Sequence, residues 1–195
     1  FSWAQGEGRN VVTGNLGGHQ YTGRLEFLPF GKFKGKGDYK GGGLTREEKP
    51  KLAVGASYDF NNNAVKTRSN QGSYMTNDIG YYETNISTVF IDAIVNYKGF
   101  SFMGEYSNRD AEDPIAKNSD GSETGDLVSE GNGLNIQSGY LFKKNWELTG
   151  RYSFIDLKLS EISEQYTFGV SKYIAGHKLK VQSDISYLTL DDIGS

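Results

Sequence analysis

The sequence of 195 residues contains no cysteine, only 3 prolines and only 2 methionines. Without cysteine, neither a disulfide framework nor thiol chemistry is available to the chain. The mean hydropathy is −0.58 and no run of about 18 apolar residues occurs, which excludes a transmembrane helix. The net charge of −3 is small, and lysine and arginine form no cluster of the kind that follows phosphates, so nucleic acid is not an expected partner.

Glycine and aromatic residues are abundant instead, with 26 Gly, 13 Tyr and 11 Phe. This composition favours many short strands and turns over helices. The chain starts at Phe1 without an initiator methionine or the basic and apolar regions of a signal peptide, and it stops at Ser195 without a closing strand. We therefore expect a single β-barrel domain, residues 1–195, that is incomplete at both ends and belongs to a longer chain.

The clearest pattern lies in residues 89–106, where two segments of alternating polarity meet at Lys98-Gly99. One side of the two segments is mostly apolar and the other is polar. The apolar side carries Val89, Ile91, Ala93, Val95, Tyr97, Phe100, Phe102 and Tyr106, and the polar side carries Asp92, Asn96, Ser101, Glu105 and Ser107. A period of two predicts a β-hairpin with one apolar and one polar face.

Six further segments alternate in the same way, so we expect about eight strands and no helix. These segments are residues 20–28, 52–60, 134–142, 146–154, 165–171 and 179–187. Tight turns are expected at 98–99, 143–145 and 174–176, whereas longer loops are expected at 61–87, 108–132 and 156–163. Short turns at one end of the strands and long loops at the other are typical of outer-membrane β-barrels.

Aromatic residues gather near the predicted turns: Tyr97 and Phe100 at the first, Tyr140, Phe142 and Trp146 at the second, and Tyr173 near the third. Such residues form a girdle where lipid meets water. The ionisable groups on the opposite face would cost several kcal/mol each in lipid, so they are expected in a wet lumen. The alternative is a soluble or surface β-barrel or β-sandwich that binds a ligand, with its apolar face inward. Periodicity alone does not distinguish the two.

Two segments resemble the phosphate-selective porin O and P family, a Bacteroidetes-type family of outer-membrane porins. They are residues 21–31 (YTGRLEFLPFG) and 48–61 (EKPKLAVGASYDFN), supported by residues 6–10 (GEGRN) and by the 89–106 hairpin. The resemblance implies a C-terminal half of a 16-stranded antiparallel transmembrane β-barrel that assembles as a homotrimer in the outer membrane of a Gram-negative bacterium. It also implies that the Gly/Lys-rich connector, residues 31–51, lies on the periplasmic side.

The expected function is a porin channel for passive diffusion of small hydrophilic solutes or ions, through contact with lipid and lipopolysaccharide and in possible association with other outer-membrane proteins. The candidate pore-lining residues are Arg24, Glu26, Asp59, Asp92, Glu105, Glu147, Arg151, Lys180 and Asp184. Three are basic and six are acidic, so these residues form no basic ladder for anions. We therefore expect a general porin, and phosphate selectivity would have to come from another part of the protein.

No catalytic or metal site is expected. The carboxylates of Asp92 and Glu105 could approach within the range that a glycosidase needs, but pairing with Arg24 or Arg151 is the simpler interpretation. The acidic stretch from Arg109 to Glu130 contains no complete calcium-binding loop. The two histidines are far apart in sequence, which leaves no zinc set and no required cofactor. A barrel enzyme remains a weaker alternative, because no nucleophile set can be assembled.

Overall fold

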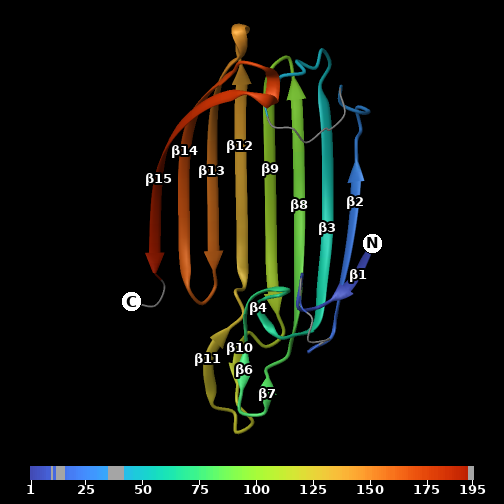
Figure 1. Cartoon of the computed structure of the whole chain (residues 1–195), viewed down its shortest axis with the longest axis vertical. Coiled ribbons are helices and arrows are strands. Elements are labelled where there is room, and N and C mark those ends of the chain that lie inside the picture. The colour runs from blue at the N-terminus through green and yellow to red at the C-terminus, as the bar shows by residue number, and fades with distance from the viewer. Residues whose placement is uncertain (10, 12–15, 35–41, 193–195) are drawn as a thin grey trace.

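The structure, a computed structural model, describes residues 1–9, 11, 16–34 and 42–192. Nine strands form one antiparallel sheet in the order β1-β2-β3-β8-β9-β12-β13-β14-β15 (Figure 1). Their bounds are β1 Ser2–Gln5, β2 His19–Phe27, β3 Lys51–Ala64, β8 Thr84–Tyr97, β9 Phe100–Ala111, β12 Gly131–Leu141, β13 Trp146–Leu157, β14 Glu161–Tyr173 and β15 Lys180–Asp192. Every neighbour in the sheet is the next long strand along the chain, so the sheet is a simple meander.

The eight predicted strands are confirmed, and β1 is a ninth. Most of them extend beyond the predicted ends toward the loops: β3 continues to Ala64, β9 to Ala111 and β13 to Leu157. The loops predicted at 61–87 and 108–132 are shorter than predicted, because both ends of each stretch belong to strands of the sheet. Those loops contain the short hairpins β4 Lys66–Arg68 with β5 Gln71–Tyr74, β6 Thr76–Asn77 with β7 Gly80–Tyr81, and β10 Ile115–Lys117 with β11 Glu123–Leu127.

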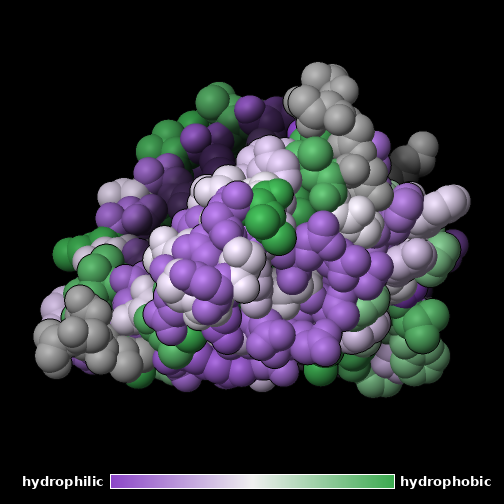
Figure 2. All heavy atoms as spheres, turned by 90° about the horizontal axis from the view of Figure 1, so that it is seen from below, coloured by the Kyte–Doolittle hydropathy of each residue, from purple (hydrophilic) through white to green (hydrophobic). Residues whose placement is uncertain are grey.

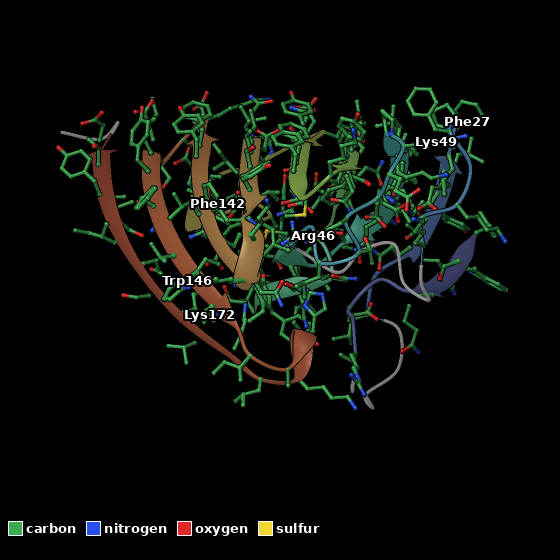
Figure 3. All side chains as sticks on the ribbon, turned by 90° about the horizontal axis from the view of Figure 1, so that it is seen from above. Phe27, Arg46, Lys49, Phe142, Trp146 and Lys172 are labelled. Atoms are coloured by element: carbon green, nitrogen blue, oxygen red, sulfur yellow. The ribbon has the colours of Figure 1, made fainter. Side chains whose placement is uncertain are left out.

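The sheet is curved and open (Figure 3). Its edges are β1 and β15, which do not pair with each other. The all-β antiparallel architecture expected from the sequence is therefore confirmed, whereas the described residues form an open sheet and not a closed barrel. Within those residues the helical structure consists of two 3-10 turns, η1 Lys143–Asn145 and η2 Gly176–Lys178, and no helix is long and apolar enough to cross a membrane.

The two ends of the sheet differ (Figure 1). The turn end carries the β8–β9 turn, η1 and η2, together with the described part of the connector before β3, residues 42–50. Lys98 and Gly99 have φ values of 47° and 89°, and positive φ at both central residues is what the tightest hairpin turns require. The loop end carries the three short hairpins. The predicted long loops are present between β3 and β8 and between β9 and β12, whereas the longer loop predicted at 156–163 is a tight turn of residues 158–160 between β13 and β14.

The loops at the loop end pack around a small apolar core of their own. Ala64, Met75, Ile86, Ala116 and Val128 are all buried there, and Tyr82 and Ala111 pack against them. Ile86 sits at the start of β8 and pairs with Ala111, so this core continues directly from the sheet. Figure 2, viewed from this end, shows hydrophilic side chains gathered over its centre and hydrophobic ones mostly toward its flanks.

A carboxylate at the loop tips ties two of these loops together and predicts a pH dependence. Asp78 accepts hydrogen bonds from the Ser119 hydroxyl and from the Ser119 backbone N–H, the latter at 2.8 Å. The Ser119 hydroxyl, with its N–H, holds the pKa of Asp78 below its ordinary value of 3.8. A depressed carboxylate pKa stabilises the folded loops above that ordinary value, and the contribution is lost as pH falls through the folded pKa.

We therefore expect hydrogen exchange at the Ser119 amide, corrected for its intrinsic rate, to be slower at about pH 5 than at about pH 2. The Asp78→Asn variant should exchange fast at both pH values, because the neutral amide is the weaker acceptor. Equal corrected rates in the wild-type protein at the two pH values would contradict the prediction.

Candidate functional site

The register of the sheet assigns each strand residue to one of two faces. Asp92 pairs with Glu105, which pairs with Asn135, and this polar row continues through Ser153 to Gln165. The neighbouring row is apolar from Ala93 onward. All nine candidate residues lie on the polar face: Arg24, Glu26, Asp59, Asp92, Glu105, Glu147, Arg151, Lys180 and Asp184. The opposite face carries charge only near the strand ends: Asp110, Asp156, Glu164 and Asp191 lie there toward the loop end, and Lys172 lies there at the turn end. The separation of charge predicted from the sequence therefore holds in the middle of the described strands and fails at their ends.

Arg24 is the centre of the first charged cluster on this face. Its two terminal nitrogens donate to the two carboxylate oxygens of Asp92 at 2.6 and 3.0 Å, and one of them lies 3.5 Å from Glu26. Gly55 lies between these residues in the register, and a side chain there would collide with the guanidinium. The carboxylate of Asp92 is thus held in an ion pair with Arg24. This agrees with the interpretation that Asp92 pairs with an arginine, and not with the alternative of a catalytic pair of carboxylates with Glu105.

Two of the nine candidate residues are buried. Asp59 is 7% exposed and its carboxylate accepts hydrogen bonds from Gln20 and Thr22 at 2.8 and 2.6 Å. Glu147 is 2% exposed and accepts a hydrogen bond of 2.6 Å from the Tyr173 hydroxyl. Both side chains belong to the polar face, but they are covered by neighbouring groups and do not form part of its open surface.

The prediction that Tyr173 belongs to an aromatic girdle on the apolar face was wrong. Its register partner is Lys180, and both residues lie on the polar face. Tyr173 is only 4% exposed and its ring meets His177 edge-on at 5.7 Å. It was expected near a lipid boundary because it ends a strand, but the alternation turns it to the opposite side. The other predicted girdle residues in the strands, Tyr97, Phe100, Tyr140 and Trp146, are on the apolar face.

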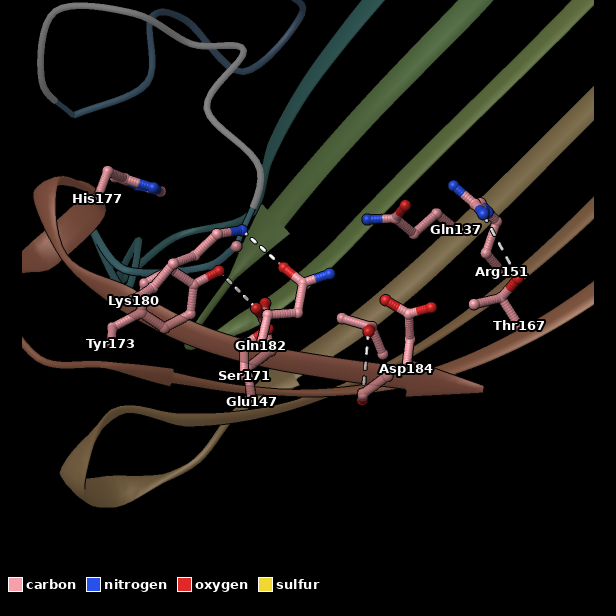
Figure 4. Close-up of a pocket in the computed structure, with 13 residues that line it drawn as sticks. Gln137, Glu147, Arg151, Thr167, Ser171, Tyr173, His177, Lys180, Gln182 and Asp184 are labelled. Atoms are coloured by element: carbon pink, nitrogen blue, oxygen red, sulfur yellow. Dashed lines mark hydrogen bonds between the residues drawn. The ribbon is translucent and has the colours of Figure 1, made fainter. Parts of the chain in front are cut away.

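A hollow of about 240 Å³ lies on the polar face of β13, β14 and β15, at the turn end (Figure 4). Side chains of both charges surround it: Glu147 and Asp184 against Arg151 and Lys180. Lys180 donates to Gln182 at 2.8 Å, and Arg151 lies 3.4 Å from the Thr167 hydroxyl. The remaining lining consists mainly of amides and hydroxyls, so this surface offers donors and acceptors to a polar solute without favouring one charge.

A second hollow, of about 700 Å³, lies on the same face in the middle of the sheet. It contains Arg24, Asp92, Glu105 and Arg151, joined by the apolar side chains of Phe90 and Ile155. The two hollows share Arg151. The lining of the second hollow is more apolar than that of the first, since it also includes Ile91, Leu134 and Phe154.

Sequence reasoning missed three charged residues of the polar face. Arg109 pairs with Thr88, Lys51 with Asn96, and Glu161 extends the polar row of β14. All three lie beyond the predicted strand ends. The available signal was that the alternation continues for several residues into the stretches that were assigned to loops. With these residues the face carries interspersed charges of both signs, and no ladder of one sign.

The carboxylates of the acidic stretch from Arg109 to Glu130 contact protein groups. Asp110 lies 2.6 Å from Lys158, Glu112 accepts from Asn85 at 2.8 Å, and Glu130 accepts from the Ala111 backbone N–H at 2.7 Å. Among the residues that the structure describes, no group of three or more His, Asp or Glu side chains is placed to hold a metal ion. Comparisons with protein-family models, curated proteins and solved structures gave no match to this chain.

Proposed function

We propose that this chain forms part of the wall of an outer-membrane β-barrel porin, with its apolar face toward lipid and its polar face toward a water-filled channel for small hydrophilic solutes. The proposal includes the homotrimeric assembly that the family resemblance implies. The observation that carries it is a pair of aromatic rows on the apolar face, which run diagonally across the sheet and enclose an uncharged band.

The two rows are six residues apart on three strands. The pairs are Tyr21 and Phe27 on β2, Phe100 and Tyr106 on β9, and Trp146 and Tyr152 on β13. Six residues of strand span about 20 Å, which is comparable to the apolar band of about 25 Å on outer-membrane barrels. The apolar-face residues between them are uncharged: Gly23 and Leu25, Phe102 and Gly104, and Leu148 and Gly150.

The rows also step along the register from strand to strand. In the row nearer the loop end, the register aligns Tyr58 of β3 with Asn108 of β9, so Tyr106 lies two residues closer to the turn end. Tyr106 in turn aligns with Phe154 of β13, and Tyr152 lies two residues closer to the turn end again. At the turn end the aromatic position moves in the same direction, from Tyr97 on β8 to Trp146 on β13. Tilted strands need such a stagger to keep a girdle level in a membrane, and barrel closure requires tilted strands. If this face met water, there would be no physical reason for such a stagger of the aromatic residues.

The free edge of the sheet supports closure by further strands. β15 has 13 residues, and its outer side has no partner among the residues that the structure describes. Val181, Ile185 and Tyr187 on its apolar face are 61, 74 and 70% exposed. Long, apolar edge strands pair with other strands or aggregate, and barrels remove such edges altogether. We propose that additional strands of the full-length protein supply the missing pairing.

Reconstitution of the full-length protein tests the function. We expect extraction to require detergent and the purified protein to give stepwise currents in planar bilayers. Because the polar face carries interspersed charges, we expect weak discrimination between anions and cations and no block of the chloride current by phosphate. A protein that stays in buffer without detergent would favour the soluble ligand-binding alternative. A correctly inserted protein without current would overturn the channel.

A further inference from the structure

The connector segment, residues 42–47, crosses the turn end of the sheet. It lies just before β3 in the chain, yet Arg46 donates hydrogen bonds to the backbone carbonyls of Leu141 and Phe142 at 2.7 and 2.5 Å. The Lys98 backbone N–H donates to the Glu47 carbonyl at 2.8 Å. In the view from this end, Arg46 lies between Phe27 and Lys49 at one flank and Trp146 and Lys172 at the other (Figure 3). The connector segment thus extends across several strands.

The connector segment lies on the polar side of the sheet. Leu141, Glu147 and Tyr173 all belong to the polar face, and they are 0, 2 and 4% exposed. Farther from the turn end on the same face, Arg151 and Asp184 are exposed. Gly42 lines the hollow beside Tyr173 and Glu147. The polar face is therefore covered where the connector segment crosses it and open beyond it.

Two glycines fix this close contact. Gly42 has a φ of 78°, and a side chain there would collide with the Tyr173 hydroxyl. A side-chain carbon on Gly43 would lie 2.7 Å from the Gly99 carbonyl oxygen. Glu47 anchors the end of the connector segment, since it is 1% exposed and its carboxylate accepts from the Lys34 backbone N–H. The backbone of the connector segment is therefore packed in place against the turn end of the sheet.

We propose that the connector segment is a constriction, which narrows the channel from the turn end by folding over the polar face. This inference rests on the proposed channel function. Beneath the connector segment, the solute path is lined by Arg151, Lys180 and Asp184, whose charges have both signs. The constriction therefore selects by size and polarity, and it adds little preference for either sign of charge.

Single-cysteine labelling tests the constriction, because these 195 residues contain no cysteine that could react. Any cysteine elsewhere in the full-length protein is first replaced by serine. Thr45 and Lys49 are both exposed residues of the same connector, but only Thr45 belongs to the connector segment, whereas Lys49 lies at the flank. The full-length variants Thr45→Cys and Lys49→Cys are reconstituted in planar bilayers and treated with a bulky methanethiosulfonate reagent. Mass spectrometry verifies equal labelling of the two.

We expect labelling of Thr45→Cys to lower single-channel conductance by roughly two-fold or more, because the added group occupies the narrowest part of the path. Labelling of Lys49→Cys should leave conductance unchanged. In a second measurement, Arg46→Ala removes both hydrogen bonds to the β12 end and should raise conductance. Equal effects of labelling at the two sites, with a normal wild-type current, would overturn the constriction while leaving the channel intact. No wild-type current would overturn the channel itself.

Discussion

Replacing Gly150 with arginine is expected to destabilise the membrane-inserted protein by about 2–4 kcal/mol. Gly150 lies on the apolar face, between the aromatic positions of Trp146 and Tyr152 on β13. A side-chain carbon at this position would meet no heavy atom within 4 Å, so a larger residue fits without a clash. With the proposed orientation the cost is that of a charge facing hydrocarbon, since steric strain is absent. Urea unfolding from phospholipid vesicles, followed by tryptophan fluorescence, measures it.

The control at the same position is Gly150→Leu. Leucine fits the same open space and faces the same surroundings, and it should leave the free energy of unfolding unchanged or raise it because lipid solvates an apolar side chain well. The pair distinguishes an apolar face that meets lipid from one that meets water. If the apolar face met water, Gly150→Arg would be harmless and Gly150→Leu would promote aggregation. That result would contradict the lipid-facing assignment of this face.

The second large effect is expected from Tyr173→Phe. The Tyr173 hydroxyl donates a 2.6 Å hydrogen bond to the buried carboxylate of Glu147, whose other oxygen has no partner among the described residues. Without the hydroxyl, the buried carboxylate of Glu147 loses its hydrogen-bond donor, which should lower the free energy of unfolding by about 1.5–3 kcal/mol. The same urea titration measures the loss. Tyr140→Phe is the matched control, because Tyr140 is 47% exposed on the opposite face and should change stability little.

A double variant distinguishes a lost hydrogen bond from a packing defect. Glu147→Met removes the carboxylate while keeping a side chain of similar length, next to Leu141 in the register. In the Glu147→Met/Tyr173→Phe protein no buried charge lacks a partner, so much of the lost stability should return. A double variant that is as unstable as the sum of the single changes would show that the pair is not coupled.

The alternation of residues predicted most of the strands and their faces. In residues 89–106 every predicted apolar or polar position lies on the predicted face, because a strand has a fixed period of two. The strand ends were less predictable. Arg109 and Glu161 sit in polar stretches that look like loops, and only pairing with a neighbouring strand keeps them extended. For Tyr173 the alternation alone gives the correct face. The prediction that it joins the aromatic girdle was wrong because it relied on its position near a turn.

The hairpins inside the loops were not predictable from the same pattern. Met75, Ala116 and Val128 come from three separate stretches of loop and are buried together in the small core at the loop end. Each directly follows one apolar or aromatic neighbour in an otherwise polar stretch, and two such residues are too few to mark a period. Their burial depends on loops that meet only after the strands have paired. The same holds for the ion pair of Arg24 with Asp92, which joins residues 68 positions apart.

Local chemistry was therefore sufficient to specify the antiparallel all-β class, the two unlike faces and the turn and loop ends, because each depends on neighbours in sequence. Folding in three dimensions decided which charges are paired, which are buried and what covers the turn end. Arg46 illustrates the difference: nothing in its sequence surroundings points to the carbonyl of Leu141, 95 residues away. The register brings such groups together, and the register is a property of the whole sheet.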